Sequence, residues 1–157
     1  MPPLRTLVTM WTQRQVVDYS LKRRALLREV YAGRVSRYEV CDASAYLKNA
    51  AKYHGERTEA RCPICRRENL TLVHYVYGDE LRHAAGRAYP RAELPRLAAG
   101  RRELRVYVVE VCRGCGWNLL VQQYLLGGTT IAGSASTGAV AAGASALAAR
   151  GKRSAQA

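Results

Sequence analysis

The chain has 157 residues, which is enough for one domain with a moderate hydrophobic core and too few for two ordinary domains. Its formal net charge is +13, which favours partners rich in phosphate or acidic groups; the alternative is that the arginines only solvate the surface. No secretory signal is visible, because the N-terminal apolar run is short and no small-residue cleavage site follows it. A cytoplasmic protein is therefore expected.

The N-terminal third is expected to be helical after a short leader. Residues 1–12 contain two prolines and no periodic pattern, which predicts a disordered leader, and Met10 could equally be the translation start. From Gln13 to Ala32 the sequence consists of helix formers, and Gly33 offers a C-terminal stop.

The stretch "CDASAYLKNAAKYHG" predicts a second helix. Asp42 or Ser44 can serve as its N-cap, small and apolar residues recur at helical spacing, and Gly55 ends the pattern. Residues 13–58 are therefore predicted to form a segment of two helices.

The first of these helices carries a basic cluster. It could contact a phosphate backbone or an acidic protein groove, or it could simply be a solvated face. The gap between the two helices is too long for a helix-turn-helix motif, whose turn has about 3 to 4 residues. The cluster consists of Lys22, Arg23, Arg24 and Arg28.

Three strands are expected in the second half of the chain, at residues 70–77, 104–111 and 117–126, because these stretches are rich in β-branched and aromatic residues. The connection at 78–103 holds several glycines and prolines. It predicts a long insertion with one short helix near 91–98.

The composition changes abruptly at residue 127. Residues 131–149 carry no charge, which raises the alternative of a membrane span, but glycine, serine, threonine and alanine dominate and would drive insertion poorly. A flexible low-complexity tail over 127–157, with no membrane span, is the better interpretation.

Four of the five cysteines form two C-x-x-C pairs, "CPIC" and "CRGCG". Each pair can turn two sulfurs toward one ion, and Gly114 and Gly116 suit the tight turn of the second pair. Two such knuckles supply the four thiolates of a structural zinc site with one Zn²⁺. The predicted ligands are Cys62, Cys65, Cys112 and Cys115.

The order knuckle, strand, insertion, strand, knuckle, strand is that of a zinc ribbon with three antiparallel strands. The excess length lies in the insertion at 78–103, where loop-closure entropy grows slowly. The fold expected is α+β: two N-terminal helices packed with a zinc ribbon over residues 59–126. A redox-active dithiol would require a βαβ setting and paired disulfides an oxidising compartment, so both are weaker alternatives.

Zinc catalysis is disfavoured, because four sulfurs leave no open position for substrate or water, and no other catalytic set is evident. Cys41 stands outside the two pairs. We expect it to be a buried small hydrophobic residue, while a role as an extra ligand or redox sensor stays open.

Arginines surround the two knuckles, at Arg61, Arg66, Arg67 and Arg113, and Trp117 follows the second knuckle. Cations beside an exposed aromatic ring can grip phosphates and stack bases. The alternative for Trp117 is that the indole packs against the metal site.

Several sequence blocks carry a resemblance to a known family. They are "RQVVDYSLKRRALL", "VCDASAYLKNAAKYHGE", "CPICR", "LVHYVYGDEL" and "VYVVEVCRGCGWNLLVQQYLLG". With these blocks, residues 14–127 resemble an actinobacterial family of small proteins of unknown function, so the resemblance implies no particular activity. At the level of fold, the ribbon resembles those of transcription and translation proteins.

Two functions are therefore expected. The first is a non-enzymatic zinc-ribbon protein that binds nucleic acid, a ribonucleoprotein or a transcription complex through its basic surfaces. The second is a protein–protein adaptor or thiol-sensitive regulator in which the zinc is purely structural.

Overall fold

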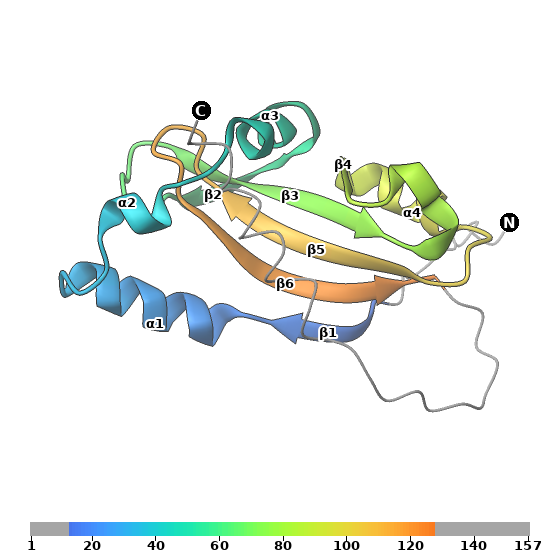
Figure 1. Cartoon of the computed structure of the whole chain (residues 1–157), viewed down its shortest axis with the longest axis horizontal. Coiled ribbons are helices and arrows are strands. Elements are labelled where there is room, and N and C mark those ends of the chain that lie inside the picture. Colours follow the sequence, from blue (N-terminus) through green and yellow to red (C-terminus); the bar gives the residue numbers. More distant parts are fainter. Residues whose placement is uncertain (1–12, 128–157) are drawn as a thin grey trace, which may run out of the picture.

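The computed structural model of the chain is described here for residues 13–127. Its centre is an antiparallel sheet in the order β1–β6–β5–β3–β2, with the short β4 also paired to β3 (Figure 1). The elements in chain order are β1 (Arg14–Asp18), α1 (Ser20–Tyr31), α2 (Arg37–Val40), α3 (Ala45–His54), β2 (Glu56–Arg61), β3 (Asn69–Tyr77), η1 (Asp79–Ala84), β4 (Arg87–Tyr89), η2 (Arg91–Glu93), α4 (Leu94–Ala98), β5 (Leu104–Val111) and β6 (Asn118–Leu126).

The three expected strands form the centre of this sheet as β3, β5 and β6. β3 and β5 pair antiparallel with Val76 opposite Val106, and β5 pairs with β6 with Val106 opposite Tyr124. Their valines and tyrosines suit a pleated surface that is buried on both faces. The mixed α/β fold with an antiparallel sheet is thus confirmed.

The expected first helix is wrong at its N-terminal end. Residues Arg14–Asp18 form β1, which pairs with the outer edge of β6, and α1 begins only at Ser20. The Asp18 carboxylate accepts a hydrogen bond from the Ser20 backbone N–H over 2.6 Å at that start. The free edge of β6 supplies a pairing partner that no local helix pattern reveals, so tertiary context overrides propensity here.

The sheet is wider than the three-stranded ribbon expected from the sequence. β2 was not expected because its residues, "ERTEAR", lie on an edge strand and are mostly exposed, so they show no apolar alternation. Alternation of apolar and polar residues along a strand arises when one face of the strand is buried, and β2 has no such face. α2 is likewise an additional short helix.

The second helix is confirmed as α3, with the Ser44 hydroxyl accepting a hydrogen bond from the Leu47 backbone N–H over 3.2 Å at its start. The long connection between β3 and β5 contains η1, β4, η2 and α4. The short helix expected near 91–98 is present there as η2 and α4.

Alternation along β3 and β5 divides the core between the two faces of the sheet. Odd-numbered residues pack with Ala50 and Ala51 of α3, and even-numbered ones pack with Leu81 of η1 and with Leu94 and Ala98 of α4. The first set is Val73, Tyr75, Tyr107, Val109 and Val111, and the second is Val76, Leu104, Val106 and Val108.

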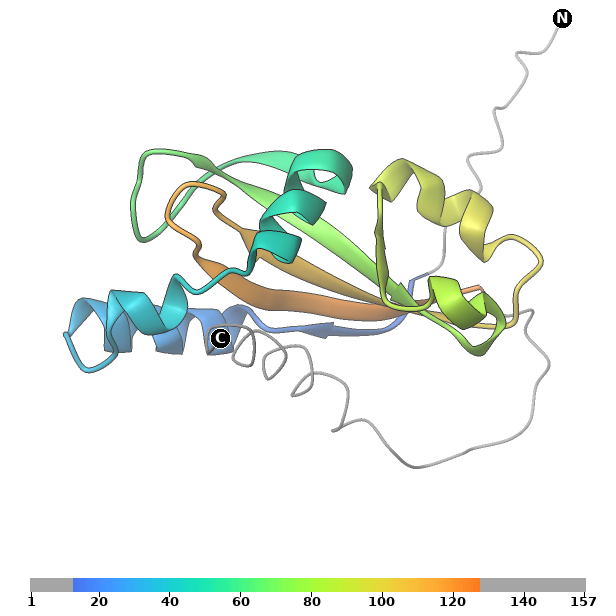
Figure 2. The ribbon, with the colours of Figure 1, turned by 45° about the horizontal axis from the view of Figure 1, so that its top comes forward.

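One end of the sheet carries the helices α1 and α2 together with the loops that join β2 to β3 and β5 to β6 (Figures 1 and 2). Within residues 13–127, no helix is both long enough and apolar enough to cross a membrane. The expected leader at 1–12 and, apart from Gly127, the expected tail at 127–157 lie outside the described residues.

Candidate metal centre

The first knuckle is the loop between β2 and β3. The Cys62 backbone N–H donates to the Glu68 carbonyl oxygen over 2.8 Å, and the Arg66 N–H donates to the Cys62 carbonyl oxygen over 3.0 Å. Arg66, directly after the second cysteine of the pair, has φ +56°. These bonds close a tight loop whose free amides can face the two sulfurs.

The second knuckle, between β5 and β6, has the same backbone pattern. The Cys112 N–H donates to the Trp117 carbonyl oxygen over 2.8 Å, and the Gly116 N–H donates to the Cys112 carbonyl oxygen over 2.9 Å. Gly116 has φ +87°, as the sequence suggested. Gly114 has no positive φ, so the reason expected for a glycine does not apply there; a Cβ would lie 2.8 Å from a carboxylate oxygen of Glu68, the end of an exposed side chain that can move away.

The two knuckles bring the four predicted ligands together. The Sγ atoms of Cys62 and Cys115 lie 3.6 Å apart, as do those of Cys65 and Cys112, and all four sulfurs lie within 4.8 Å of one another. Cys62 and Cys112 are fully buried, whereas Cys65 and Cys115 are partly exposed. These four cysteines could hold one metal ion.

Burial opposes ionisation of these thiols. It raises the pKa values of Cys62 and Cys112, and it raises the pKa of Cys115 to about 12. Burial also acts to raise the pKa of Cys65, but hydrogen bonds from the Arg67 and Glu68 backbone, together with those from Cys112 and Cys62, outweigh it and bring that pKa to about 7. A set of four adjacent thiolates therefore needs a cation at its centre.

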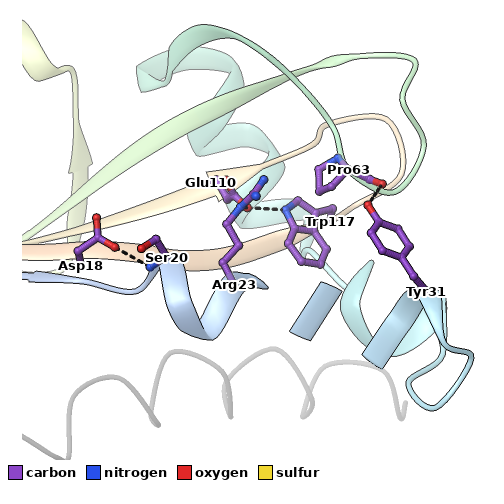
Figure 3. A network of polar contacts seen from close by, with 7 residues as sticks. All are labelled: Asp18, Ser20, Arg23, Tyr31, Pro63, Glu110 and Trp117. Atoms are coloured by element: carbon purple, nitrogen blue, oxygen red, sulfur yellow. Dashed lines mark hydrogen bonds and ion pairs between the residues drawn. The ribbon is translucent and has the colours of Figure 1, made fainter. Parts of the chain in front are cut away.

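Helix α1 is tied to both knuckles, as Figure 3 shows. At its C-terminal end, the Tyr31 hydroxyl donates to the Pro63 carbonyl oxygen of the first knuckle over 2.8 Å. Near its start, Arg23 Nε lies 2.6 Å from Glu110 Oε1, the same oxygen that accepts a 2.8 Å hydrogen bond from Trp117 Nε1. The helix is thus part of the wall around the sulfurs.

Trp117 is fully buried in one cluster with Cys62 and Cys112. This burial contradicts its candidate role as a base-stacking surface and agrees with the alternative that the indole packs against the cysteine site. Burying an indole with its N–H paired to Glu110 is favourable in both area and hydrogen bonding. Glu110 itself was not identified from the sequence. A single acid inside the apolar stretch "LRVYVVEV" was the available signal, because a buried carboxylate needs partners.

The fifth cysteine lies beside the cluster rather than alone in the core. Cys41, at the end of α2, is partly exposed, and its Sγ lies 3.7 Å from Cys115 Sγ. The adjoining backbone is fixed by a 3.0 Å hydrogen bond from Ala43 N–H to the Gly116 carbonyl oxygen. Burial, more than any other cause, raises the pKa of Cys41.

The candidate contact cations fall into two groups. Lys22, Arg24 and Arg28 are exposed on α1, while Arg23 is occupied by its ion pair with Glu110. The other group lies on the knuckles and their flanks, where all four side chains are exposed; Arg61 Nη1 also donates to the Arg67 carbonyl oxygen over 3.2 Å. This second group, the knuckle arginines, is Arg61, Arg66, Arg67 and Arg113.

Comparison with known proteins gives this architecture a family. Residues 10–140 match a family described as a family of unknown function, DUF5318, and the chain belongs to that family. Similar proteins are the uncharacterized protein Mb0050 of Mycobacterium bovis and the uncharacterized protein Rv0049 of Mycobacterium tuberculosis. Each is 53% identical over 111 residues, which cover 71% of this chain and 81% of the relative. No solved structure gives a significant match.

Proposed function

We propose that the protein is a non-enzymatic zinc-binding module whose single Zn²⁺ is structural and whose basic metal-proximal surface binds nucleic acid. The observation that carries the first part is the convergence of four cysteine sulfurs from two knuckles of matching backbone geometry. The second part rests on the arginines that surround those knuckles.

Zinc is the metal that best fits these ligands. A tetrahedral site with Zn–S distances near ~2.3 Å has sulfur–sulfur edges of about 3.8 Å. The 3.6 Å separations of Cys62 from Cys115 and of Cys65 from Cys112 are close to that value. A closed set of four thiolates is typical of structural zinc. An iron centre has related ligands and is the alternative that elemental analysis separates.

The arrangement of strands supports a zinc ribbon inside the larger sheet. The first knuckle leads into β3, and the second connects β5 to β6, so that three adjacent antiparallel strands meet the site at one end. β1, β2 and α1 then extend this unit on both sides. A closed set of four sulfurs offers no open coordination position, which supports a binding function over metal catalysis.

The proposed nucleic-acid surface consists of the knuckle arginines. Arg66 and Arg67 lie on the first knuckle, Arg113 lies on the second, and Arg61 ends the adjoining strand β2. Since the four sulfurs bring the two knuckles together, these guanidinium groups lie on one end of the molecule and could contact neighbouring phosphates. Cytoplasmic location and association with a transcription or translation complex are part of the same proposal.

Metal analysis tests the zinc site. The purified full chain is expected to contain about one zinc per molecule, and Cys112→Ser is expected to lose both the metal and the cooperative unfolding transition. Cys41→Ser is the matched control, because this cysteine is outside the group of four, and it should keep the metal. A metal-free protein that unfolds cooperatively would refute the proposal.

Charge-matched variants test the nucleic-acid surface. Arg66, Arg67 and Arg113 are replaced together by Gln, and the control replaces Arg87, Arg96 and Arg102, which are exposed on the connection between β3 and β5. Affinity for single-stranded RNA and duplex DNA is measured by fluorescence anisotropy at several salt concentrations.

Only the knuckle variant should lose affinity strongly, and its log–log salt slope should fall by about 0.7 to 0.9 for each phosphate contact removed. Equal losses of affinity in both variants would show that net charge, rather than the knuckle surface, determines binding. Binding without salt dependence, or capture of one protein partner that nuclease treatment leaves intact, would instead favour the adaptor.

A further inference from the structure

We propose that Cys41 and Cys115 are an oxidisable pair: peroxide converts them to a disulfide, which removes Cys115 from the metal. The proposal concerns a thiol outside the group of four sulfurs and its contact with one member of that group. It rests on the proposed zinc site only for the metal release, since the disulfide itself can be detected whether or not metal is present.

Cys41 is a thiol outside the group of four whose sulfur contacts a member of that group. Cys41 Sγ and Cys115 Sγ are 3.7 Å apart, so they must approach by less than 2 Å to reach the ~2.05 Å of a disulfide bond. Cys115 also lies 3.6 Å from Cys62, but Cys62 belongs to the group of four. Cys41 does not belong to it, so it is the neighbouring thiol that can react without giving up a second metal bond.

Exposure also favours this pair. Cys62 and Cys112 are fully buried, so among the four ligands peroxide can reach Cys65 and Cys115. Across the site, Cys65 Sγ lies 3.6 Å from the sulfur of the buried Cys112, another member of the group of four. Cys115, by contrast, contacts a partly exposed sulfur that is not a ligand.

The backbone around Cys41 is held in place by contacts on both of its sides. The Cys41 N–H donates to the Arg37 carbonyl oxygen over 2.9 Å at the end of α2, and Ala43 N–H donates to Gly116 across to the second knuckle. α2 itself starts with a capping box between Ser36 and Glu39. The proximity of the two sulfurs is therefore built into the packing of α2 on the knuckle.

The chemistry balances with a peroxide as the named oxidant. The Cys115 thiolate attacks the peroxide O–O bond, which forms a sulfenic acid and releases hydroxide. The Cys41 thiol then attacks that sulfur: the S–S bond forms, the S–O bond breaks, and the hydroxyl leaves with the thiol proton as water. Two electrons pass from the two sulfurs to the peroxide, and the metal loses one thiolate.

Peptide mapping decides which disulfide forms. Zinc-loaded full chain is treated with hydrogen peroxide, blocked with N-ethylmaleimide and digested with trypsin without reduction. Cleavage places Cys41 in peptide 38–48, Cys62 and Cys65 in 62–66, Cys112 in 106–113 and Cys115 in 114–150. The first disulfide is expected to join peptides 38–48 and 114–150, and zinc release, followed with a chromogenic chelator, should keep pace with it.

Cys41→Ser provides the matched variant, because it leaves all four sulfurs of the group in place. Its zinc release at equal peroxide is expected to slow several-fold, with Cys115 sulfenic acid becoming trappable by dimedone. A first disulfide among peptides 62–66, 106–113 and 114–150, or release at the wild-type rate from Cys41→Ser, would overturn the proposal. If the protein contains no zinc, the proposed metal site fails while the peptide map still decides whether Cys41 and Cys115 are paired.

Discussion

Trp117 Nε1 donates a hydrogen bond to Glu110 Oε1 over 2.8 Å, and both side chains are buried. Arg23 Nε of α1 forms an ion pair with the same Glu110 oxygen over 2.6 Å. A buried carboxylate is costly unless it is paired, so this arrangement links α1, β5 and the second knuckle through one atom.

Glu110→Ala is expected to lower the free energy of unfolding by about 2 to 4 kcal/mol, because it removes the hydrogen-bond acceptor of the buried Trp117 N–H and the ion-pair partner of Arg23. Urea denaturation measures this loss. The control is Glu103→Ala, which removes the exposed pair with Arg14 and should cost less than about 1 kcal/mol. Similar losses in the two variants would show that the buried pair is not special.

Gly116→Ala should be more damaging than an alanine at another glycine with positive φ. At Gly116, φ is +87° and a Cβ would lie 2.8 Å from the Cys41 carbonyl oxygen. At Gly33, φ is +74° and no atom of the described part of the chain lies within 4 Å of the Cβ. Gly33→Ala should therefore lower the free energy of unfolding by only the penalty for a left-handed backbone, about 1 kcal/mol. Gly116→Ala should cost clearly more by denaturation and should weaken metal retention.

Metal removal is expected to expose Trp117. Its carbonyl oxygen accepts the Cys112 N–H, so the indole is positioned directly by the second knuckle. In a Trp11→Phe background, where Trp117 is the remaining tryptophan, a strong chelator should shift its fluorescence to longer wavelength and lower the melting temperature. An unshifted spectrum after complete metal loss would show that the knuckle holds its shape without the ion.

His74 is expected to make the protein less stable in mild acid. Burial is the main cause that lowers its pKa; Arg91 acts in the same direction and Glu56 opposes it. Among residues 13–127, its Nδ1 finds no hydrogen-bond partner. Because the folded-state pKa lies below the unfolded value, the folded protein loses stability relative to the unfolded chain as pH falls below about 6.5.

The unfolding free energy should therefore fall between pH 7 and pH 5.5. The measurement is the unfolding free energy of wild type and His74→Gln at both pH values. Effects of acid on the thiolates are common to the two proteins, so their difference isolates His74. Parallel pH dependence in both proteins would contradict the assignment.

The centre of the sheet and the cluster of four cysteines could be predicted from sequence because their signals are local. Val106, Val108 and Val109 belong to a β-rich run, and each C-x-x-C pair has its turn within a few residues. β1 and β2 could not be recognised in this way. They are edge strands, and their structure depends on hydrogen bonds offered by β6 and β3 rather than on a buried face of their own.

Contacts between distant residues escaped prediction for a related reason. Cys41 was expected in the core, but its sulfur reaches Cys115 only after α2 has packed on the second knuckle. The pairing of Arg23 with Glu110 likewise depends on where α1 turns away from β1. The sequence indicates that a buried carboxylate needs a partner, but the tertiary arrangement determines which cation that partner is.

The two ends of the described chain meet at the edge of the sheet, where Arg14 Nη2 donates to the Gly127 carbonyl oxygen over 2.8 Å. β6 runs from Asn118 beside the second knuckle to Leu126, a span of about 27 Å at ~3.4 Å per residue. A short linker could therefore join residue 127 to residue 13 in a circular permutant without approaching the sulfurs. Affinity tags or fluorophores joined directly to residue 13 or residue 127 would be attached at this distal end, away from the knuckle arginines.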